Sequence, residues 1–183
     1  MAGSSDAVEL ELAPEDGGRD RLKGRAYWMA MVLGSAGVAL TINQTFNLQV
    51  FGEPIIDTSF YYLILGLFLS LAFLAYPARK ADRNAIPWYD WVLFATCIVT
   101  TAYLAWNGGR IVAEGWDLVA PLEAVVVAGV VCVLALEGVR RAGGMVLFCL
   151  CTAFAFYPTF ADVMPGFLWG PSSTLPETLT AHA

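Results

Sequence analysis

Charged side chains and histidine are scarce in this sequence. Of its 183 residues only 14% are charged and 58% are hydrophobic, whereas a soluble domain has about 25% charged and roughly 45 to 50% apolar residues. This composition excludes an ordinary soluble domain and indicates a chain surrounded by lipid. The single histidine, His182, stands next to the C-terminus, so the apolar segments contain no histidine to ligate a haem and no histidine or lysine to act as a catalytic base. We therefore expect neither an enzyme nor a haem-binding subunit.

The four cysteines lack the spacing of a metal or redox motif. Cys97, Cys132, Cys149 and Cys151 all lie in apolar segments, and no pair has the C-x-x-C spacing. Cys149 and Cys151 are two residues apart and would point to different faces of a helix, which excludes a zinc site built on them. We expect buried free thiols, no metal and no cofactor.

The N-terminus lacks a secretory signal. Residues 1–23 are polar and acidic, without a basic segment followed by an apolar core and a small-residue cleavage site. Residues 1–20 are rich in Ser, Asp, Glu and Gly and contain too few apolar side chains to offset the entropy of ordering. We expect residues 1–25 to form a disordered cytoplasmic tail.

Five long apolar runs follow this tail. They cover residues 26–49, 59–76, 88–105, 118–139 and 143–160. Each has about the 20 residues that a helix needs to cross a hydrocarbon core of ~30 Å. Pro158 and Pro165 leave the fifth run two possibilities, to span the membrane or to lie on or re-enter it. The predicted fold class is all-α, a polytopic bundle of four to five transmembrane helices over residues 26–165, with a C-terminal tail over 166–183.

Basic residues mark one side of these runs. Cytoplasmic loops near membrane crossings carry an excess of Lys and Arg. Arg110 stands alone on one side, and the other side has Arg19, Arg21, Lys23, Arg25, Arg79, Lys80, Arg83, Arg140 and Arg141. This pattern predicts a cytoplasmic N-terminus, and five spans would then put the C-terminal tail in the periplasm, whereas four would leave it inside. Trp88 and Trp91 at the inner side and Trp106 at the outer side agree, since Trp favours the headgroup level.

Two carboxylates lie within the apolar runs. Glu137 precedes Arg140 and Arg141 by three and four residues, the spacing at which opposite charges meet on one helix face, which predicts a structural ion pair. Glu123 lies about one turn inside span four, where the helix dipole favours an anion. It is predicted to be a capping or snorkelled carboxylate answered by Arg110, with proton or sodium coupling as the alternative.

Further polar residues stand at the ends of spans one and three. Asn43 and Gln44 belong to an unusually polar outer third of span one, and we favour hydrogen bonds to a neighbouring helix over a substrate site. Asp90 follows Pro87 in the first turn of span three, which indicates an N-terminal cap among aromatic anchors. The glycine-rich outer loop over residues 106–121 is long enough for a short interfacial helix.

Three strings in a fixed order carry a family resemblance. They are Tyr76-Pro77-Ala78-Arg79-Lys80, Ile86-Pro87-Trp88-Tyr89-Asp90-Trp91 and Leu136-Glu137-Gly138-Val139-Arg140-Arg141. In this order and spacing they resemble the N-terminal part of fused TRAP transporter permeases of the TAXI type, which belong to tripartite, binding-protein-dependent secondary transporters. The second string is the most specific, and the similarity covers about residues 26–165. Gln44 and the stretch 121–123 also stand where that family tends to have a Gln and a Pro-Leu-acid triplet.

The resemblance implies a small scaffold component without a substrate site. In that family a large permease subunit carries the substrate and sodium sites in an elevator-like domain, the small component packs against its fixed part, and a soluble binding protein delivers organic acids from the periplasm. The implied partners are the large permease subunit, the periplasmic binding protein and the lipid bilayer of a bacterial or archaeal cytoplasmic membrane, with no nucleic acid. A fused permease would continue beyond Ala183, so the transport sites are expected elsewhere.

Two groups of residues are candidates for contacts with these partners. The candidates for docking of the binding protein are Arg110, Glu114 and Trp116. The candidates for contacts with the large subunit are Asn43, Gln44, Trp88 and Trp91. Two alternatives stay open: the small membrane subunit of a tripartite tricarboxylate-type transporter, which should lack the Trp-Tyr-Asp-Trp string, and a membrane assembly protein without a transport role.

Overall fold

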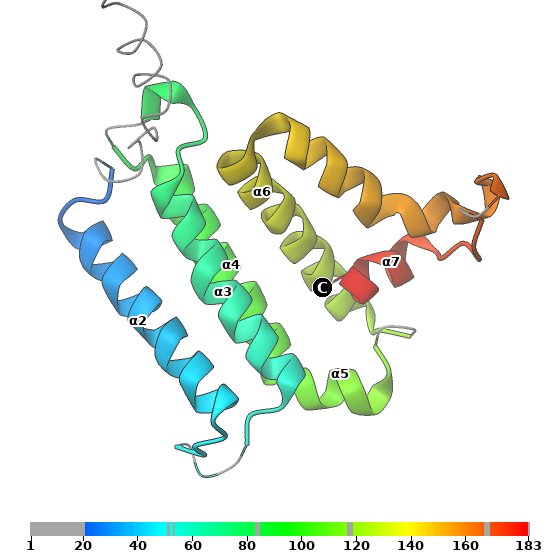
Figure 1. Ribbon diagram of the computed structural model, residues 1–183, viewed down its shortest axis with the longest axis horizontal. Helices are drawn as coiled ribbons and strands as arrows, with labels where there is room; N and C mark the ends of the chain where they lie inside the picture. Colours follow the sequence, from blue (N-terminus) through cyan, green and yellow to red (C-terminus); the bar gives the residue numbers. More distant parts are fainter. Residues whose placement is uncertain are drawn as a thin grey trace, which may run out of the picture.

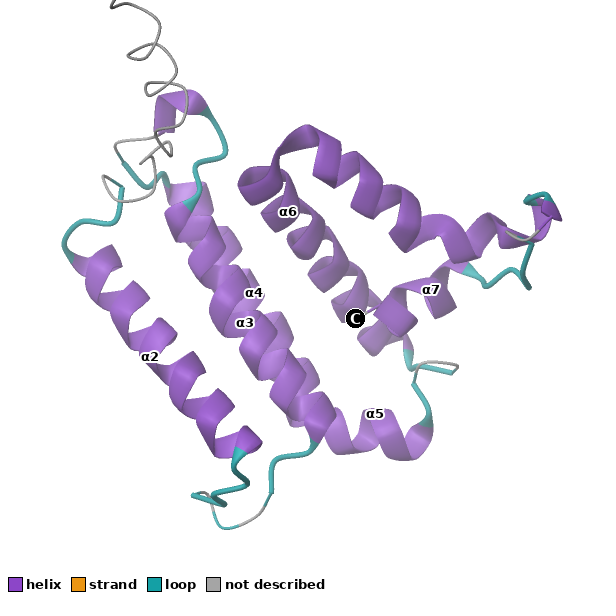
Figure 2. Cartoon of the chain, in the orientation of Figure 1, coloured by secondary structure: helices purple, strands orange, loops and turns teal. Residues whose placement is uncertain are grey.

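The chain, seen in a computed structural model, is built from helices (Figures 1 and 2). The structure describes residues 21–50, 52, 54–82, 85–116, 119–166 and 169–182. Of the tail predicted to be disordered over residues 1–25, residues 1–20 lie outside them. Residues 21–25 are described, and the prediction is wrong there, because Arg21 is buried and Arg25 begins a helix. The elements of the described residues are α2 (Arg25–Thr45), α3 (Asp57–Ala75), η1 (Lys80–Asp82), α4 (Trp88–Trp106), α5 (Gly108–Glu114), α6 (Leu122–Phe156), η2 (Tyr157–Val163) and α7 (Leu175–His182). No strand occurs among the described residues, so the predicted all-α fold is confirmed.

Local sequence sets the ends of α4 and α5. Pro87 holds an extended conformation (φ −69°, ψ 161°) immediately before α4, a position where its missing N–H costs nothing. Asn107 ends α4, and α5 leaves at an angle of 52° to it. Helix α5 ends at Gly115, whose φ of 64° is the left-handed conformation that glycine adopts readily. The loop over residues 106–121 therefore contains a short helix, as the sequence had suggested.

Helices α3 and α4 and the first part of α6 form the packed centre of the molecule (Figure 1). The buried apolar residues gather in two clusters, one of Phe73, Cys97 and Leu134 and the other of Tyr62, Leu104, Ala105 and Val131. Helices α3 and α4 approach most closely at Gly66, where an added methyl group would overlap the Thr101 side chain. Helix α2 lies against α3, and Gly37 lets it approach the ring of Phe68.

Several helices are long and apolar enough to cross a membrane. They are α2, α3 and the stretch Leu122–Val163, and the bent pair α4 and α5 makes a fourth candidate if it counts as one span. The first four predicted runs fall on α2, α3, α4 and the first part of α6. The order of helices thus agrees with a polytopic membrane protein, because consecutive helices of this length pass the hydrocarbon core in alternate directions.

Gly144 divides the long helix α6 into two arms. Its φ of 78° and ψ of −177° lie in a region that is nearly restricted to glycine. As one straight helix the 42 residues Leu122–Val163 would be about 63 Å long, roughly twice the hydrocarbon core. Instead the chain turns sharply where α6 changes from yellow to orange in Figure 1, and the second arm runs back at an angle to the first. The fifth predicted run, 143–160, lies on this second arm.

The C-terminal segment returns to the bundle. Helix α7 packs against α6, and Thr178 is buried in this contact. Leu179 lies within 3.6 Å of the position that a Cβ on Gly129 would occupy. The sequence predicts only a tail over 166–183, because so short a helix between polar and proline-containing stretches has no apolar run to reveal it.

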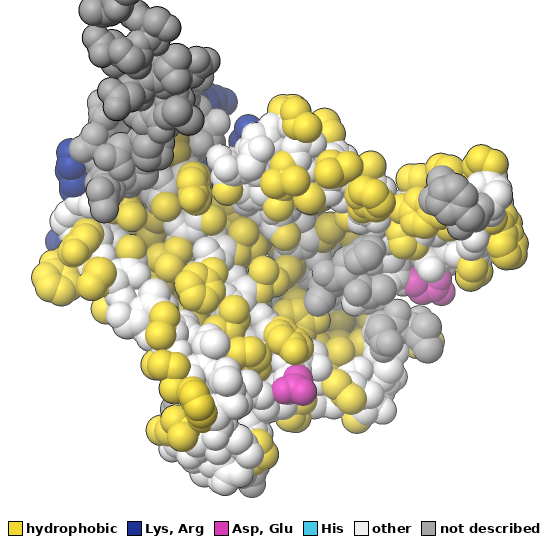
Figure 3. All heavy atoms as spheres, in the orientation of Figure 1, with side chains coloured by type: hydrophobic (Ala, Val, Ile, Leu, Met, Phe, Trp, Pro, Cys, Tyr) yellow, Lys and Arg dark blue, Asp and Glu magenta, His cyan; other side chains and the backbone are white. Residues whose placement is uncertain are grey.

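Charge and apolar surface are separated along the helices. On the face shown in Figure 3, the Lys and Arg side chains gather at the end where α2 begins and α6 turns, while apolar side chains cover much of the remainder. Large apolar side chains are exposed on the helices themselves, among them Trp28, Val99 and Val146. Such a surface is typical of helices that face lipid rather than water.

Candidate functional site

The first turn of α4 carries a fully buried carboxylate. Asp90 has no exposed surface, and its backbone N–H donates to the carbonyl oxygen of Pro87 at 3.1 Å. The helix start at Pro87 therefore fixes where the carboxylate stands. An isolated buried carboxylate is costly, so Asp90 requires cationic partners.

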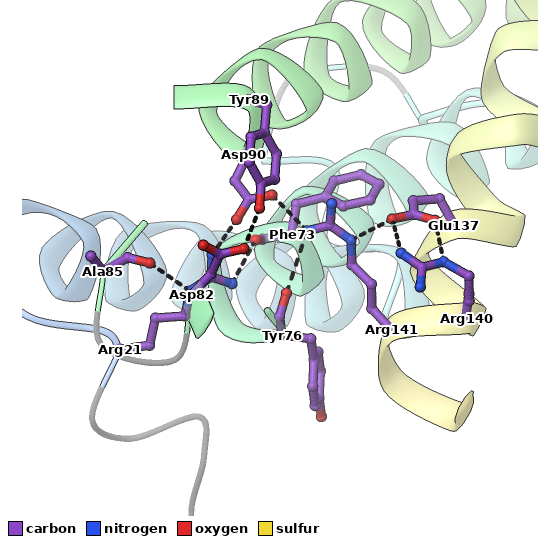
Figure 4. A network of polar contacts seen from close by, with 10 residues as sticks. All are labelled: Arg21, Phe73, Tyr76, Asp82, Ala85, Tyr89, Asp90, Glu137, Arg140 and Arg141. Atoms are coloured by element: carbon purple, nitrogen blue, oxygen red, sulfur yellow. Dashed lines mark hydrogen bonds and ion pairs between the residues drawn. The ribbon is translucent and has the colours of Figure 1, made fainter. Parts of the chain in front are cut away.

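Two arginines from distant parts of the chain supply these partners (Figure 4). Arg21 donates from Nη2 to Oδ2 of Asp90, and both side chains are fully buried. Arg141, near the end of the first arm of α6, donates from Nη1 to Oδ1 at 2.7 Å and is itself only 2% exposed. Each oxygen of the carboxylate thus accepts from a different arginine, and such charge-assisted hydrogen bonds are stronger than neutral ones.

The contacts continue along α6 to Glu137 and Arg140. Arg141 donates from Nε to Oε1 of Glu137 at 2.7 Å, and Arg140 donates from Nε to Oε2 at 2.7 Å. The ion pair that the sequence predicts between Glu137 and these arginines is confirmed. What the sequence did not predict is that Arg141 also bonds Asp90 and so joins α6 to α4. We call the five residues Arg21, Asp90, Glu137, Arg140 and Arg141 the arginine–carboxylate network.

Backbone and ring contacts tie the same arginines to the end of α3. Arg21 donates to the carbonyl oxygens of Phe73 and Ala85, at 3.4 Å in each case. Arg141 donates to the carbonyl oxygen of Tyr76 at 3.4 Å, and its guanidinium lies 5.2 Å from the centre of the Phe73 ring. The last carbonyl groups of a helix lack partners within the helix, and arginine donors near this end also suit the helix dipole.

The network fixes geometry rather than providing a reactive group. An arginine is not deprotonated in proteins, and both carboxylates accept their hydrogen bonds from arginine donors of the same chain. A buried ion pair adds little net stability compared with apolar packing, but loss of one partner is strongly destabilising. The network therefore holds the segment before α2, the end of α3, the start of α4 and the turn of α6 in one arrangement.

A second polar cluster lies at the other end, on α5. Arg110 donates from Nε to Oε1 of Glu114 at 3.0 Å and from Nη1 to Oδ1 of Asn107 at 3.3 Å. Trp116 donates from Nε1 to Oε2 of Glu114 at 2.7 Å, and the Arg110 guanidinium lies 5.2 Å from the Trp116 ring centre. These hydrogen bonds, from Trp116 first and then from Arg110, lower the pKa of Glu114. The three residues predicted for docking thus form one cluster.

Exposure differs among these three residues. The side chains of Arg110 and Glu114 are 57% and 48% exposed, whereas Trp116 is buried. A partner at this end would therefore touch the ion pair, while Trp116 supports it from below. Arg110 does not bond Glu123, its predicted partner, because Glu114 and Asn107 take its donors. Docking at Arg110 and Glu114 stays a prediction.

The polar residues of span one are used within the chain. Asn43 is buried, and its Oδ1 accepts from the backbone N–H of Val50 at 3.2 Å. Gln44 donates from Nε2 to Oδ1 of Asp57 at 2.9 Å and to the carbonyl oxygen of Ile55 at 3.1 Å. Both side chains therefore shape the connection between α2 and α3. Their contact with a large subunit remains a prediction, because these hydrogen bonds within the chain do not test it.

The two tryptophans that flank Asp90 have different surroundings. Trp88 is 77% exposed at the start of α4, whereas the ring of Trp91 packs against Phe94 with 5.9 Å between ring centres. Of the two, Trp88 offers the larger free surface to a neighbouring helix or to lipid headgroups. Its contact with a large subunit also stays a prediction.

No group of three or more His, Cys, Asp or Glu that could hold a metal ion occurs within the described residues. All four cysteines are free thiols. Cys97 is buried as expected, whereas Cys132 and Cys151 are partly exposed and Cys149 is exposed, so the expectation of buried thiols is confirmed for Cys97 alone. Cys149 and Cys151 lie on the second arm of α6. The reason for their exposure is that this arm leaves the packed centre after Gly144.

The sequence interpretation missed Asp90 as the centre of the network. The sequence does contain a signal for it. Asp90 stands between two aromatic residues at a helix start, and the adjacent Arg140 and Arg141 are predicted on the same side of the membrane. Spacing within a helix predicts the pair of Glu137 with Arg140 and Arg141, but contacts between helices depend on packing.

In comparisons with known proteins, no protein-family model, curated protein or solved structure matches this chain.

Proposed function

We propose that this chain is the small, non-substrate-binding membrane component of a TRAP-type tripartite secondary transporter. The observation that carries the proposal is the meeting of the three strings that bear the resemblance. Tyr76, Asp90 and Glu137 come from the three strings, and Arg141 contacts all of them. Residues that are separated by up to 65 positions in the sequence thus share one set of contacts, which is expected if the strings serve one structural purpose.

A scaffold role agrees with the chemistry of the buried groups. Both carboxylates of the arginine–carboxylate network are paired with its own arginines, and the network stands at the ends of the helices, not at their middle. A substrate or ion site in a transporter is commonly built from broken helices near the centre of the membrane. The break in α6 at Gly144 lies three residues beyond Arg141, at the end of the bundle. Rigid packing without a central polar site suits a fixed support.

The proposal includes a membrane, an orientation and partners. The end with the network and most basic residues faces the cytoplasm of a bacterial or archaeal cell, in accordance with the excess of Lys and Arg in cytoplasmic loops. The other end, with Arg110 and Glu114, faces the periplasm and receives the binding protein. A large elevator-type permease carries the substrate site, and coupling to sodium and transport of organic acids belong to that subunit.

Co-purification from native membranes tests the proposal. The chain is tagged, the membranes are solubilised gently, and the proteins that remain attached are identified by mass spectrometry. A large multi-span permease in the eluate is the expected result. Recovery of the chain alone, or with partners unrelated to transport, would sink the proposal while leaving the helical fold intact.

A pair of variants tests the periplasmic end separately. Changing both Arg110 and Glu114 to alanine removes the exposed ion pair on α5 and should weaken retention of the binding protein without affecting membrane insertion. Arg25→Ala serves as the control, because Arg25 is exposed and lies at the start of α2, at the end of the bundle away from α5 (Figure 1). Equal retention by the double variant and the control would refute docking at this cluster.

A further inference from the structure

A polar pocket opens beside the network at the same end of the bundle. It has a volume of about 370 Å³ and lies between the connection that follows α3, the start of α4 and the end of the first arm of α6. The lining residues are Ala78, Arg79, Tyr89, Glu137, Arg140 and Arg141. Three arginines therefore face one pocket whose only acidic lining residue is Glu137.

Two of these arginines have donors to offer. Arg141 already binds Asp90 and Glu137, and only 2% of its side chain is exposed. Arg140 binds Glu137 through Nε and Nη2 and keeps 31% of its side chain exposed. Arg79 is exposed and forms no ion pair with any residue that the structure describes. Arg79 and Arg140 thus present guanidinium groups toward the same opening.

The charge of this region is not balanced by the described residues. Four arginines, which are Arg21, Arg79, Arg140 and Arg141, face three carboxylates, which are Asp82, Asp90 and Glu137. Asp82 accepts a hydrogen bond from the Tyr89 hydroxyl, so its carboxylate is directed to Tyr89. Among the described residues, Arg79 is therefore left without a carboxylate partner at the pocket, where an anion would balance its charge.

We propose that this pocket binds the phosphate group of an anionic phospholipid. The planar fork of arginine donors matches phosphate oxygens, and basic pockets between helices at the cytoplasmic side of a membrane are suited to anionic headgroups. The neighbouring surface suits acyl chains, since Trp88, Met145 and Val146 are 77%, 60% and 86% exposed. A phosphate with apolar chains attached fits this combination better than a free anion does. The site does not depend on the transporter role.

Lipid binding by the purified full chain tests the proposal. The protein in neutral detergent is incubated with phosphatidylglycerol or phosphatidylcholine of the same chain lengths, and the retained lipids are counted by native mass spectrometry. Arg79→Gln removes the unpaired cation of the pocket. Arg25→Gln is the matched control, because Arg25 is also exposed at this end but does not line the pocket. Unchanged circular dichroism establishes that both variants are folded.

The wild-type protein should retain phosphatidylglycerol in preference to phosphatidylcholine. Arg79→Gln should lower phosphatidylglycerol binding about fivefold, the loss expected for one basic side chain near an anionic headgroup, and Arg25→Gln should leave it unchanged. An equal loss in the two variants would mean a diffuse basic surface and would overturn the site. No preference between the two lipids would overturn it as well. Displacement of phosphatidylglycerol by millimolar inorganic phosphate would reassign the pocket to a soluble anion.

Discussion

Removal of the charge of Asp90 is the sharpest perturbation of the fold. Asp90→Asn keeps the size of the side chain but leaves Arg21 and Arg141 facing a neutral amide. Both guanidinium groups are almost fully buried, and breaking a buried ion pair by removing one partner costs about 3–5 kcal/mol. We expect the free energy of unfolding to fall by this amount, since Arg141 keeps Glu137 but Arg21 loses the one carboxylate that it contacts among the described residues.

Two further variants give this prediction an internal scale. Arg21→Gln leaves Asp90 paired with Arg141 and should cost less, about 1.5–3 kcal/mol, the range for hydrogen bonds to charged groups. The double variant of Asp90→Asn with Arg21→Gln should cost less than the sum of the single changes, because no bare arginine then remains at that position. Arg110→Gln removes an exposed pair and should cost about 0–1 kcal/mol.

The assay is reversible unfolding of the purified chain in mixed micelles with increasing sodium dodecyl sulfate, followed by circular dichroism. The expected order of stability is wild type, then Arg110→Gln, then Arg21→Gln, then Asp90→Asn. If Asp90→Asn unfolds within about 1 kcal/mol of the wild type, the network does not hold the helix ends together, and the reasoning from burial fails.

Three other predictions follow from single contacts. Gly66→Ala should destabilise the chain by about 1–3 kcal/mol in the same unfolding assay, because the added methyl group overlaps Thr101. Combination with Thr101→Ala should restore the stability. Gly34→Ala is the control and should be harmless, because its added methyl group meets nothing. The pKa of Glu114 is lowered, so its contacts persist at neutral pH and are lost as the pH falls through a value below 4.5. Protonation of Glu114 in this acidic range should change the tryptophan fluorescence, and the change should disappear in Glu114→Gln. If the N-terminus is cytoplasmic and the chain crosses five times, as the sequence predicts, alkaline phosphatase fused after Ala183 should be active. An inactive fusion would favour four crossings.

The helices themselves were predictable from the sequence because each depends on local composition. Runs of about 20 apolar residues need no tertiary information, and Pro87 marks the start of α4 by its own geometry. The pair of Glu137 with Arg140 follows from helical spacing alone. These features lie within one segment of chain, where distance in sequence fixes distance in space.

The contacts that assemble the site were not predictable in the same way. The partners of Asp90 are 69 and 51 positions away, and only the packing of α4 against α6 brings Arg141 to it. Arg21 stands in a stretch that composition assigns to a disordered tail over residues 1–25, yet it is buried. Helix α7 was missed because its stability comes from packing on α6, which a short polar sequence does not reveal.

The proposed place of this chain beside a large permease is tested most directly by cross-linking in native membranes. Trp88, which is 77% exposed, is replaced by a photo-reactive amino acid, the membranes are irradiated, and the adduct is identified by mass spectrometry. The account predicts an adduct with a large multi-span permease. Adducts formed only with another copy of this chain or with proteins unrelated to transport would contradict it.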